Sequence, residues 1–241
     1  MSAPDLTLYT LGGAFGLRSV SPFCLKLELL LAALELPHQL KEEPDPRKAP
    51  KGKLPYLQVG SKVIADSELI LDELDRLSGG RVFGELDPQQ RAYGLGLSRL
   101  VEEHLYWIMV ASRWLDDDWW PNVVRDFFHI APALVRPLIA GAARRQVRQT
   151  YRLQGLGLHT RAEQESFARR DLQALSDALD GGQPFLFGST PSVYDFTITG
   201  LTATIFQQQP RTWLNGIADE FPVLEAHAER VQQAVGVFAA R

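Results

Sequence analysis

Two short segments carry residues whose types and spacing suit the binding of a negatively charged group. The first is Ser21-Pro22-Phe23-Cys24, which follows a glycine-punctuated loop and opens a strongly apolar run. Ser21 is a favourable N-cap, and Pro22 suits the first helical position because its missing N–H would be unsatisfied there anyway. The pattern predicts a helix whose positive end carries a hydroxyl group. Ser21 has two interpretations, a cap alone or a cap that also acts on a bound group.

The second segment is the pair Asp66-Ser67, which precedes the helical pattern ELILDELDRL. Ser67 is a natural N-cap, although Ile70 stands where a capping box needs Glu or Gln. Free backbone N–H groups and the helix dipole favour anions at such a position. A cap and a binding site are therefore compatible interpretations of this helix start, because a capping hydroxyl can also serve a ligand.

A third polar segment, Ser192-Val193-Tyr194-Asp195, has a different character. It places an acid three residues after a serine, ahead of an apolar helix. Asp195 can accept from the Ser192 N–H, as in a capping box. We interpret this segment as structural and predict no binding role for it.

The composition excludes several classes of protein. The 241 residues include 25 Lys+Arg and 29 Asp+Glu, and the net charge of −4 is too small to indicate nucleic-acid or anionic-membrane binding. The single cysteine, Cys24, rules out an intramolecular disulfide and suits a reducing compartment. We see no secretory signal, no stretch able to span a bilayer and no metal-ligand spacing among the histidines. We therefore expect a cytoplasmic protein without a metal site.

The elements that must position these residues fall into two groups. The first eighty residues mix strand and helix patterns, and residues 79–88 look like a linker. Beyond the linker the patterns are helical throughout. The predicted strands are 6–11, 38–43, 54–60 and 62–66, and the predicted helices are 22–36, 67–78, 89–115, 131–153, 161–179, 192–206 and 221–236. We predict an α/β domain over residues 1–80 and an all-helical domain over residues 89–241.

Three separated motifs together resemble the glutathione transferase family. They are SPFCLK at 21–26, KLPYLQVGSKVIADSELI at 53–70 and FLFGSTPSVYDFTITGL at 185–201. The motif YRLQGLGLHTRAE at 151–163 further resembles the branch of failed-axon-connection and metaxin-like proteins. The resemblance covers nearly the whole chain. It implies the glutathione transferase fold, a thioredoxin-like N-terminal domain followed by an all-helical C-terminal domain.

The resemblance places Ser21 where the family activates glutathione, its co-substrate. A thiol with a pKa near 8.5 is only about 3% ionised at pH 7, and lowering that pKa by about two units requires about 2.7 kcal/mol. A helix N-terminus supplies about 0.3–1 kcal/mol, up to about 2 in a sheltered site. A hydroxyl hydrogen bond to the charged sulfur adds about 1.5–3 kcal/mol. Together the two contributions suffice, and we expect Ser21 to be catalytic.

The resemblance implies further residues that bind glutathione. The Leu54–Pro55 bond would be cis, which leaves the Leu54 backbone free to pair with the cysteinyl unit. Lys53 would contact the glycyl carboxylate, although a solvated loop lysine is nearly as good an interpretation. Asp66 and Ser67 would bind the ammonium and carboxylate of the γ-glutamyl end.

Other residues receive less weight. Cys24 occupies the place of the second cysteine of a Cys-x-x-Cys motif, but Ser21 replaces the first cysteine. Dithiol exchange is therefore excluded, and a buried, inert thiol is expected.

By fold analogy, Tyr106, Trp107 and Trp114 would face an inter-domain cleft that holds an apolar electrophile. The run RWLDDDWWP at 113–121 would either line that pocket or form a solvated turn between core tryptophans.

Three functions follow. The leading hypothesis is a detoxifying glutathione transferase, a homodimer without a membrane span that joins glutathione to a small apolar electrophile. The alternative is a non-catalytic interaction protein of metaxin-like type, and the long loop at 12–20 before Ser21 favours it because this loop could cover the thiol site. A glutathione-dependent lyase, isomerase or dehalogenase is a third possibility, since one activated thiolate serves many reactions.

Overall fold

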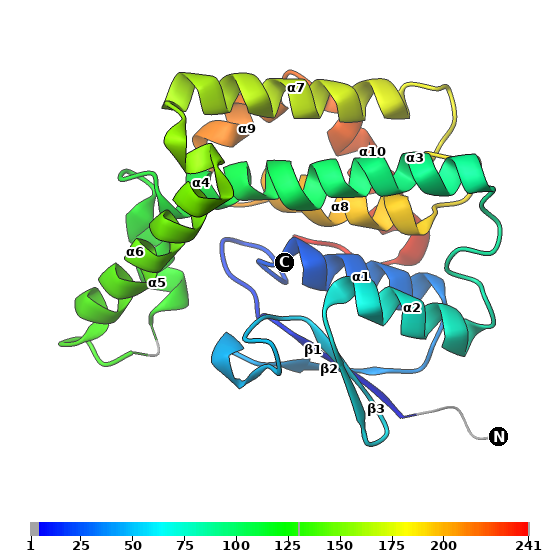
Figure 1. Ribbon diagram of the computed structural model, residues 1–241, viewed down its shortest axis with the longest axis horizontal. Helices are drawn as coiled ribbons and strands as arrows, with labels where there is room; N and C mark the ends of the chain where they lie inside the picture. The colour runs from blue at the N-terminus through cyan, green and yellow to red at the C-terminus, as the bar shows by residue number, and fades with distance from the viewer. Residues whose placement is uncertain (1–4, 130, 241) are drawn as a thin grey trace.

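The computed structural model describes residues 5–129 and 131–240, so part of the N-terminal segment judged for a secretory signal lies outside the described residues. The N-terminal part is a four-stranded sheet covered on one face by two helices (Figure 1). Its strands lie in the order β2-β1-β3-β4, with β1 parallel to β2 and antiparallel to β3. Its elements are β1 (Leu6–Thr10), α1 (Pro22–Ala33), β2 (Gln39–Glu42), β3 (Tyr56–Val59), β4 (Lys62–Ala65) and α2 (Ser67–Ser78). The predicted element order is confirmed.

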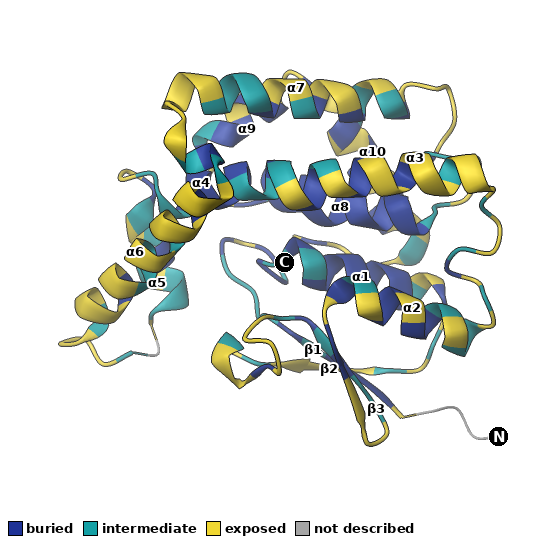
Figure 2. Cartoon of the chain, in the orientation of Figure 1, coloured by how far each residue is buried: buried dark blue, intermediate teal, exposed yellow. Residues whose placement is uncertain are grey.

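The helix α1 is buried on nearly all sides, because it lies between the sheet and the helix α8 (Val193–Phe206) (Figures 1 and 2). An amphipathic surface helix would show one apolar face, whereas a helix that is apolar all round must be enclosed. Leu8 and Leu57, paired across β1 and β3, are completely buried beneath it. The start of α1 therefore has a rigid support from both parts of the molecule.

The C-terminal part is entirely helical in the described residues, so the predicted fold class is confirmed. The predicted helix 89–115 is helical up to Trp114, with a π-helical stretch (Leu100–Leu105) between α3 (Pro88–Arg99) and α4 (Tyr106–Trp114). Two short helices, α5 and α9, fall outside the prediction. The remaining elements are α3 (Pro88–Arg99), α4 (Tyr106–Trp114), α5 (Trp120–Phe127), α6 (Arg136–Gln154), α7 (Arg161–Leu179), α9 (Trp213–Ala218) and α10 (Pro222–Val235).

The capping box at the start of α8 is present and structural, as predicted. Asp195 is completely buried and accepts from both the backbone N–H and the hydroxyl of Ser192 at 2.8 and 2.6 Å. Its other oxygen accepts from the Leu186 N–H and pairs with the His227 Nε2, both at 2.8 Å. Burial alone would raise the Asp195 pKa, but these partners hold it below its ordinary value. The carboxylate thus joins α8 to α10 and the loop before α8.

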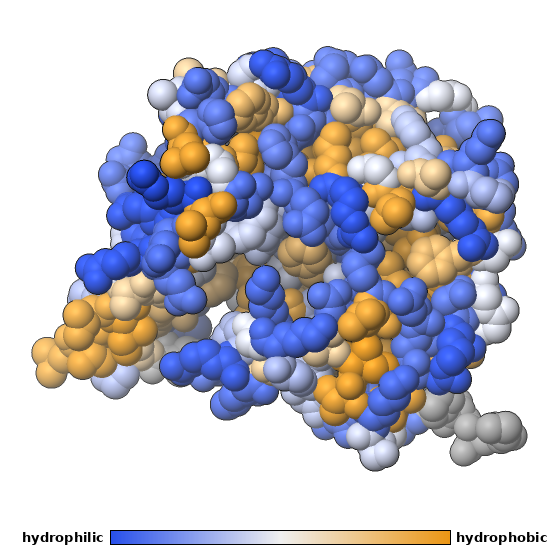
Figure 3. All heavy atoms as spheres, viewed as in Figure 1, coloured by the Kyte–Doolittle hydropathy of each residue, from blue (hydrophilic) through white to orange (hydrophobic). Residues whose placement is uncertain are grey.

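The surface has an apolar tip where α6 begins. Its exposed side chains are Leu134, Val135, Leu138 and Ile139. Figure 3 shows apolar atoms gathered at this end of the molecule. Within residues 5–129 and 131–240, no helix combines the length and the apolar character that crossing a bilayer requires.

Close contact between α1 and α8 depends on Gly200, which generates our first prediction. A Cβ atom at Gly200 would lie 2.6 Å from the Pro22 carbonyl oxygen. In Gly200→Ala, overpacking should cost about 1–3 kcal/mol, more than the gain of up to about 1 kcal/mol from helix propensity. Urea unfolding should show net destabilisation.

The matched control is Gly96→Ala in α3, where an added Cβ has no neighbour within 4 Å. This substitution should leave stability unchanged or raise it by up to about 1 kcal/mol. Equal stability changes in the two variants would contradict a tight α1–α8 contact.

Candidate functional site

Ser21 lies at the start of α1 and is half-buried. Its backbone is extended, and its hydroxyl oxygen accepts from the Cys24 N–H at 3.3 Å. Pro22 is the first helical residue, as predicted. The N-cap role is therefore confirmed, and in it the hydroxyl oxygen acts as the acceptor.

The loop at 12–20 packs against the helical part of the molecule. The Phe15 ring lies 4.7 Å from the Trp119 ring and 5.4 Å from the Phe127 ring, measured between centroids. The Phe15 carbonyl accepts from the Gln209 N–H at 2.8 Å, and the Arg18 N–H donates to the Ala239 carbonyl at 2.7 Å. These contacts account for the loop's length and leave Ser21 partly exposed.

Cys24 is completely buried one turn after Ser21. Its sulfur accepts from the Leu11 N–H at 3.4 Å. Burial raises the pKa of the Cys24 thiol, and the weaker effects of hydrogen bonds from Ser21, Thr10 and Leu11 do not reverse this. The expectation of a buried thiol is confirmed, and its inertness stays a prediction.

The segment before β3 agrees with the expected geometry. The Leu54–Pro55 peptide bond is cis. Pro55 is buried, Leu54 is half-buried and Lys53 is exposed.

The start of α2 corrects one prediction. The N-cap is Asp66 rather than Ser67: the Asp66 carbonyl accepts the first helical bond, from Ile70, and its carboxylate accepts from the Glu68 N–H at 3.0 Å. Asp and Ser both favour the N-cap position. Asp66 takes it because its backbone is non-helical, whereas Ser67 already belongs to the helix. Asp66 has φ 107° and ψ 128°, a strained conformation for a residue with a side chain.

Ser67 is consequently the first helical residue. It is only 8% exposed, and its hydroxyl has no hydrogen-bond partner among the described residues. Backbone strain concentrates where a fold is arranged around a ligand. The Asp66-Ser67 pair combines such strain with a hydroxyl that has no partner among the described residues.

A buried ammonium group fixes the starts of α1 and α2 relative to each other. Lys26, 1% exposed, places its Nζ 2.6 Å from Glu102 and 3.1 Å from Glu68. Arg99 approaches the other Glu68 oxygen at 2.8 Å. Burial would raise the Glu68 pKa, but Lys26 and Arg99 hold it below its ordinary value. Glu68 is the neighbour of Ser67, so the network reaches the candidate site.

A second buried cation, Arg113 of α4, was missed by the sequence analysis. Its guanidinium donates to Gln208 Oε1 at 2.6 Å, to the Thr204 carbonyl at 2.9 Å and to the Val20 carbonyl at 3.3 Å. No carboxylate within the described part of the chain pairs with it. Burial lowers its pKa to about 10, which leaves it charged at neutral pH. A positive charge therefore lies next to the residue that precedes Ser21.

The three aromatic residues predicted to face one cleft do not do so together. The Tyr106 ring lies 5.0 Å from the Phe23 ring of α1, at the junction of the two parts. Trp107 packs against the core of the helical part. Trp114 instead packs on Trp120, 5.9 Å away, because it lies two turns further along α4.

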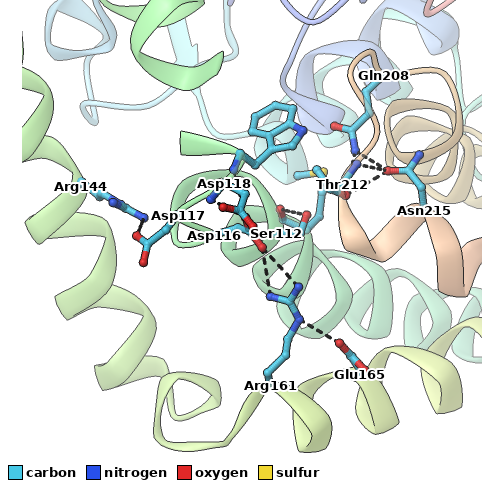
Figure 4. Close-up of polar contacts among 12 residues, drawn as sticks. Ser112, Asp116, Asp117, Asp118, Arg144, Arg161, Glu165, Gln208, Thr212 and Asn215 are labelled. Carbon is cyan, nitrogen blue, oxygen red and sulfur yellow. Dashed lines mark hydrogen bonds and ion pairs between the residues drawn. The ribbon is translucent and has the colours of Figure 1, made fainter. Parts of the chain in front are cut away.

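The acidic run after α4 is a turn between packed tryptophans, the second of the two interpretations. Asp116 accepts from the Asp118 and Trp119 N–H groups, both at 3.0 Å, and also pairs with Arg161 of α7 (Figure 4). Asp117 pairs with Arg144 of α6 at 2.7 Å. These carboxylates hold helices together, and no cluster of metal-binding type occurs among the described side chains.

Fold and site together define a class. A small mixed sheet with α1 and α2 on one face, followed by a helical bundle, is the glutathione transferase fold. A solved glutathione S-transferase from Methylobacterium radiotolerans, in complex with glutathione sulfonate, has a TM-score of 0.62 to this chain. The two are 16% identical, and the match covers 98% of this chain and 97% of that one.

The sequence comparisons identify the family. Residues 22–119 match the glutathione S-transferase N-terminal domain, and residues 168–231 match the C-terminal domain. The chain is 31% identical to isoprene-epoxide–glutathione S-transferase of Rhodococcus sp. (strain AD45), over 95% of this chain and 98% of that protein. It belongs to the glutathione S-transferase family.

The failed-axon-connection and metaxin-like resemblance is also confirmed. The chain is 29% identical to Failed axon connections of Drosophila melanogaster, over 74% of this chain and 45% of that protein. It is 29% identical to metaxin-1 of Mus musculus, over 86% of this chain and 67% of that protein.

The burial of Cys24 generates a prediction about thiol reactivity. Iodoacetamide should modify the native protein far more slowly than the urea-unfolded chain, as followed by mass spectrometry. Because burial raises the thiol pKa, the native rate should stay low even at pH 8.5, about the ordinary pKa of cysteine. Prompt alkylation of the native protein would show that Cys24 is an accessible thiolate.

Proposed function

We propose that this protein binds glutathione at the starts of α1 and α2 and activates its thiol for attack on a small apolar electrophile. The observation that carries the proposal is the Asp66-Ser67 pair, where a strained backbone and a hydroxyl without a partner among the described residues occur at a helix N-terminus. Family membership supplies the identity of the ligand that fits there.

In this proposal each part of glutathione has its own contacts. The γ-glutamyl carboxylate accepts from the Ser67 hydroxyl and the free N–H groups of α2, and Asp66 accepts from the ammonium. The cysteinyl unit pairs with the Leu54 backbone. Lys53, which is exposed beside this segment, meets the glycyl carboxylate.

The glutathione thiolate would be stabilised both by Ser21 with its helix α1 and by the nearby charge of Arg113. The Ser21 hydroxyl donates to the sulfur, and the dipole of α1 favours its negative charge. Arg113 adds an unpaired, buried positive charge, and its guanidinium donates a hydrogen bond to the Val20 carbonyl. A charge in such surroundings acts more strongly than one in water, because the effective dielectric constant is lower.

The electrophile would lie beside Phe23 and Tyr106, whose rings meet where α1 contacts α4. The relative named for isoprene epoxide supports an epoxide as the electrophile class. Thiolate attack on an epoxide carbon opens the ring, and the resulting alkoxide takes up a proton to give a hydroxy thioether.

The direct test is calorimetric titration with glutathione, followed by conjugation assays with small aliphatic epoxides. The proposal predicts saturable binding and a conjugation rate above that of glutathione alone. Binding without turnover would favour the alternative, a non-catalytic interaction protein like the metaxin-like relatives. Absence of binding would contradict the proposal itself.

Ser67→Ala tests the γ-glutamyl contact. Loss of a hydrogen bond to a charged group should weaken glutathione binding by about 1–3 kcal/mol. The control, Ser78→Ala, removes a hydroxyl at the opposite end of α2 and should leave the dissociation constant unchanged. The same constant for both folded variants would remove Ser67 from the binding site.

Ser21→Gly separates capping from catalysis. As a cap, Ser21 is worth only a few tenths of a kcal/mol relative to glycine. As a donor to sulfur, its loss should raise the pKa of bound glutathione by about one to two units. The thiolate absorbance of the bound complex, followed against pH, reports this value.

Ser192→Gly is the control, because it removes the hydroxyl of a helix cap at α8, away from the proposed thiol site. Its stability should fall, while the bound thiol titrates as in the wild type. A Ser21→Gly titration that coincides with the wild-type curve would make Ser21 a cap only.

A further inference from the structure

The helical part contains a cavity of about 540 Å³ that the proposed glutathione site does not use. It lies between α4, α6 and the start of α7. Ala111 and Leu115 form an apolar wall, while arginines 145, 148, 152 and 161 supply charge. Its volume is within the range of about 300–1,000 Å³ that is usual for small-molecule sites.

The cavity opens on the far side of α4 from the start of α1. Tyr106 and Arg113, seven residues apart, share the face of α4 that meets Phe23 and Val20. Ala111 and Leu115, four residues apart, lie on the opposite face, because each residue advances about 100° around a helix. The cavity is therefore separate from the Ser21 site.

Three arginines of α6 that line the cavity carry charge that no carboxylate of the described residues compensates. Arg145, Arg148 and Arg152 recur at spacings of three and four, so they form one stripe along the helix. None of the three pairs with a carboxylate among residues 5–129 and 131–240. Arg161, in contrast, is paired with Asp116 and Glu165 (Figure 4).

One residue that lines the cavity, Tyr151, also has an unpaired buried hydroxyl group. Tyr151 is 2% exposed, and its hydroxyl has no hydrogen-bond partner in the described structure. Burial raises the Tyr151 pKa, so this group remains a proton donor at neutral pH. A buried donor without a partner is costly, and a ligand in the adjoining cavity would supply that partner.

The segment YRLQGLGLHTRAE, residues 151–163, forms the turn between α6 and α7 that closes the cavity. A Cβ atom at Gly157 would lie 2.7 Å from the backbone nitrogen of Arg152. Only glycine allows the chain to pass this close to α6 and deliver Arg161 to the cavity. Tyr151, Arg152, Gly157 and Arg161 of this segment all line it.

We propose that this cavity binds a small organic anion that carries phosphate or carboxylate groups. Arginine forks and a tyrosine hydroxyl match the oxygens of either group. The wall formed by Ala111 and Leu115 accommodates the carbon skeleton. The inference is independent of the proposed glutathione function.

Calorimetric titration with two probes, citrate and inorganic pyrophosphate, tests the proposal. At least one probe should bind with 1:1 stoichiometry, and its affinity should fall at high salt. The probe that binds more tightly shows whether the cavity prefers carboxylate or phosphate groups. The double variant Arg148→Gln/Arg152→Gln should bind about 10- to 100-fold more weakly. The control Arg170→Gln removes the same kind of charge outside the cavity and should bind as the wild type does.

Tyr151→Phe separates a ligand contact from a structural role. It should weaken binding of the probe several-fold without lowering the thermal stability of the free protein, because the hydroxyl has no partner to lose. Glutathione titrations of all these variants should match the wild type. The proposal is overturned if neither probe saturates at millimolar concentration, if Arg170→Gln weakens binding equally, or if the double variant loses glutathione binding.

Discussion

The buried ammonium group of Lys26 is the interaction on which the arrangement of the molecule depends. It connects α1 to the first turn of α2 through Glu68 and to the π-helical segment through Glu102. A buried charge that loses its partners is strongly destabilising, so these three elements keep one relative position. Gly200 acts together with this pairing, since it lets α8 approach the first turns of α1.

This constraint explains how two separate helix starts can serve one ligand. Lys26 lies five residues after Ser21, and Glu68 directly follows Ser67. The Lys26–Glu68 ion pair therefore holds the N-termini of α1 and α2 close together. The long loop before Ser21 is fixed by a different contact, because its Phe15 packs among the aromatic rings of α5 and its neighbours. Arg113 then brings charge from the helical part to the Val20 carbonyl, so both parts of the chain contribute to the surroundings of Ser21.

Local signals account for what the sequence could predict. The Ser21 cap, the capping box at Ser192 and the succession of strands and helices each depend on neighbouring residues. The assignment of the α2 cap to Ser67 was wrong because Asp66 is an equally good capping residue, and the strained φ that decides between them has no sequence signal. Arg113 and Val20 are 93 residues apart, so only the folded chain shows their contact. The apolar sequence around Lys26 did contain a signal, since a lysine enclosed by leucines needs a buried acid as partner.

The central claim is that glutathione lies across the starts of α1 and α2 with its sulfur at Ser21. The most direct measurement is a crystal structure of the protein with saturating glutathione. The account predicts the sulfur within hydrogen-bond distance of the Ser21 hydroxyl, and the γ-glutamyl carboxylate on Ser67 at the first turn of α2. Glutathione bound elsewhere, such as in the arginine-lined cavity beside α6, or absent from both helix starts, would contradict it.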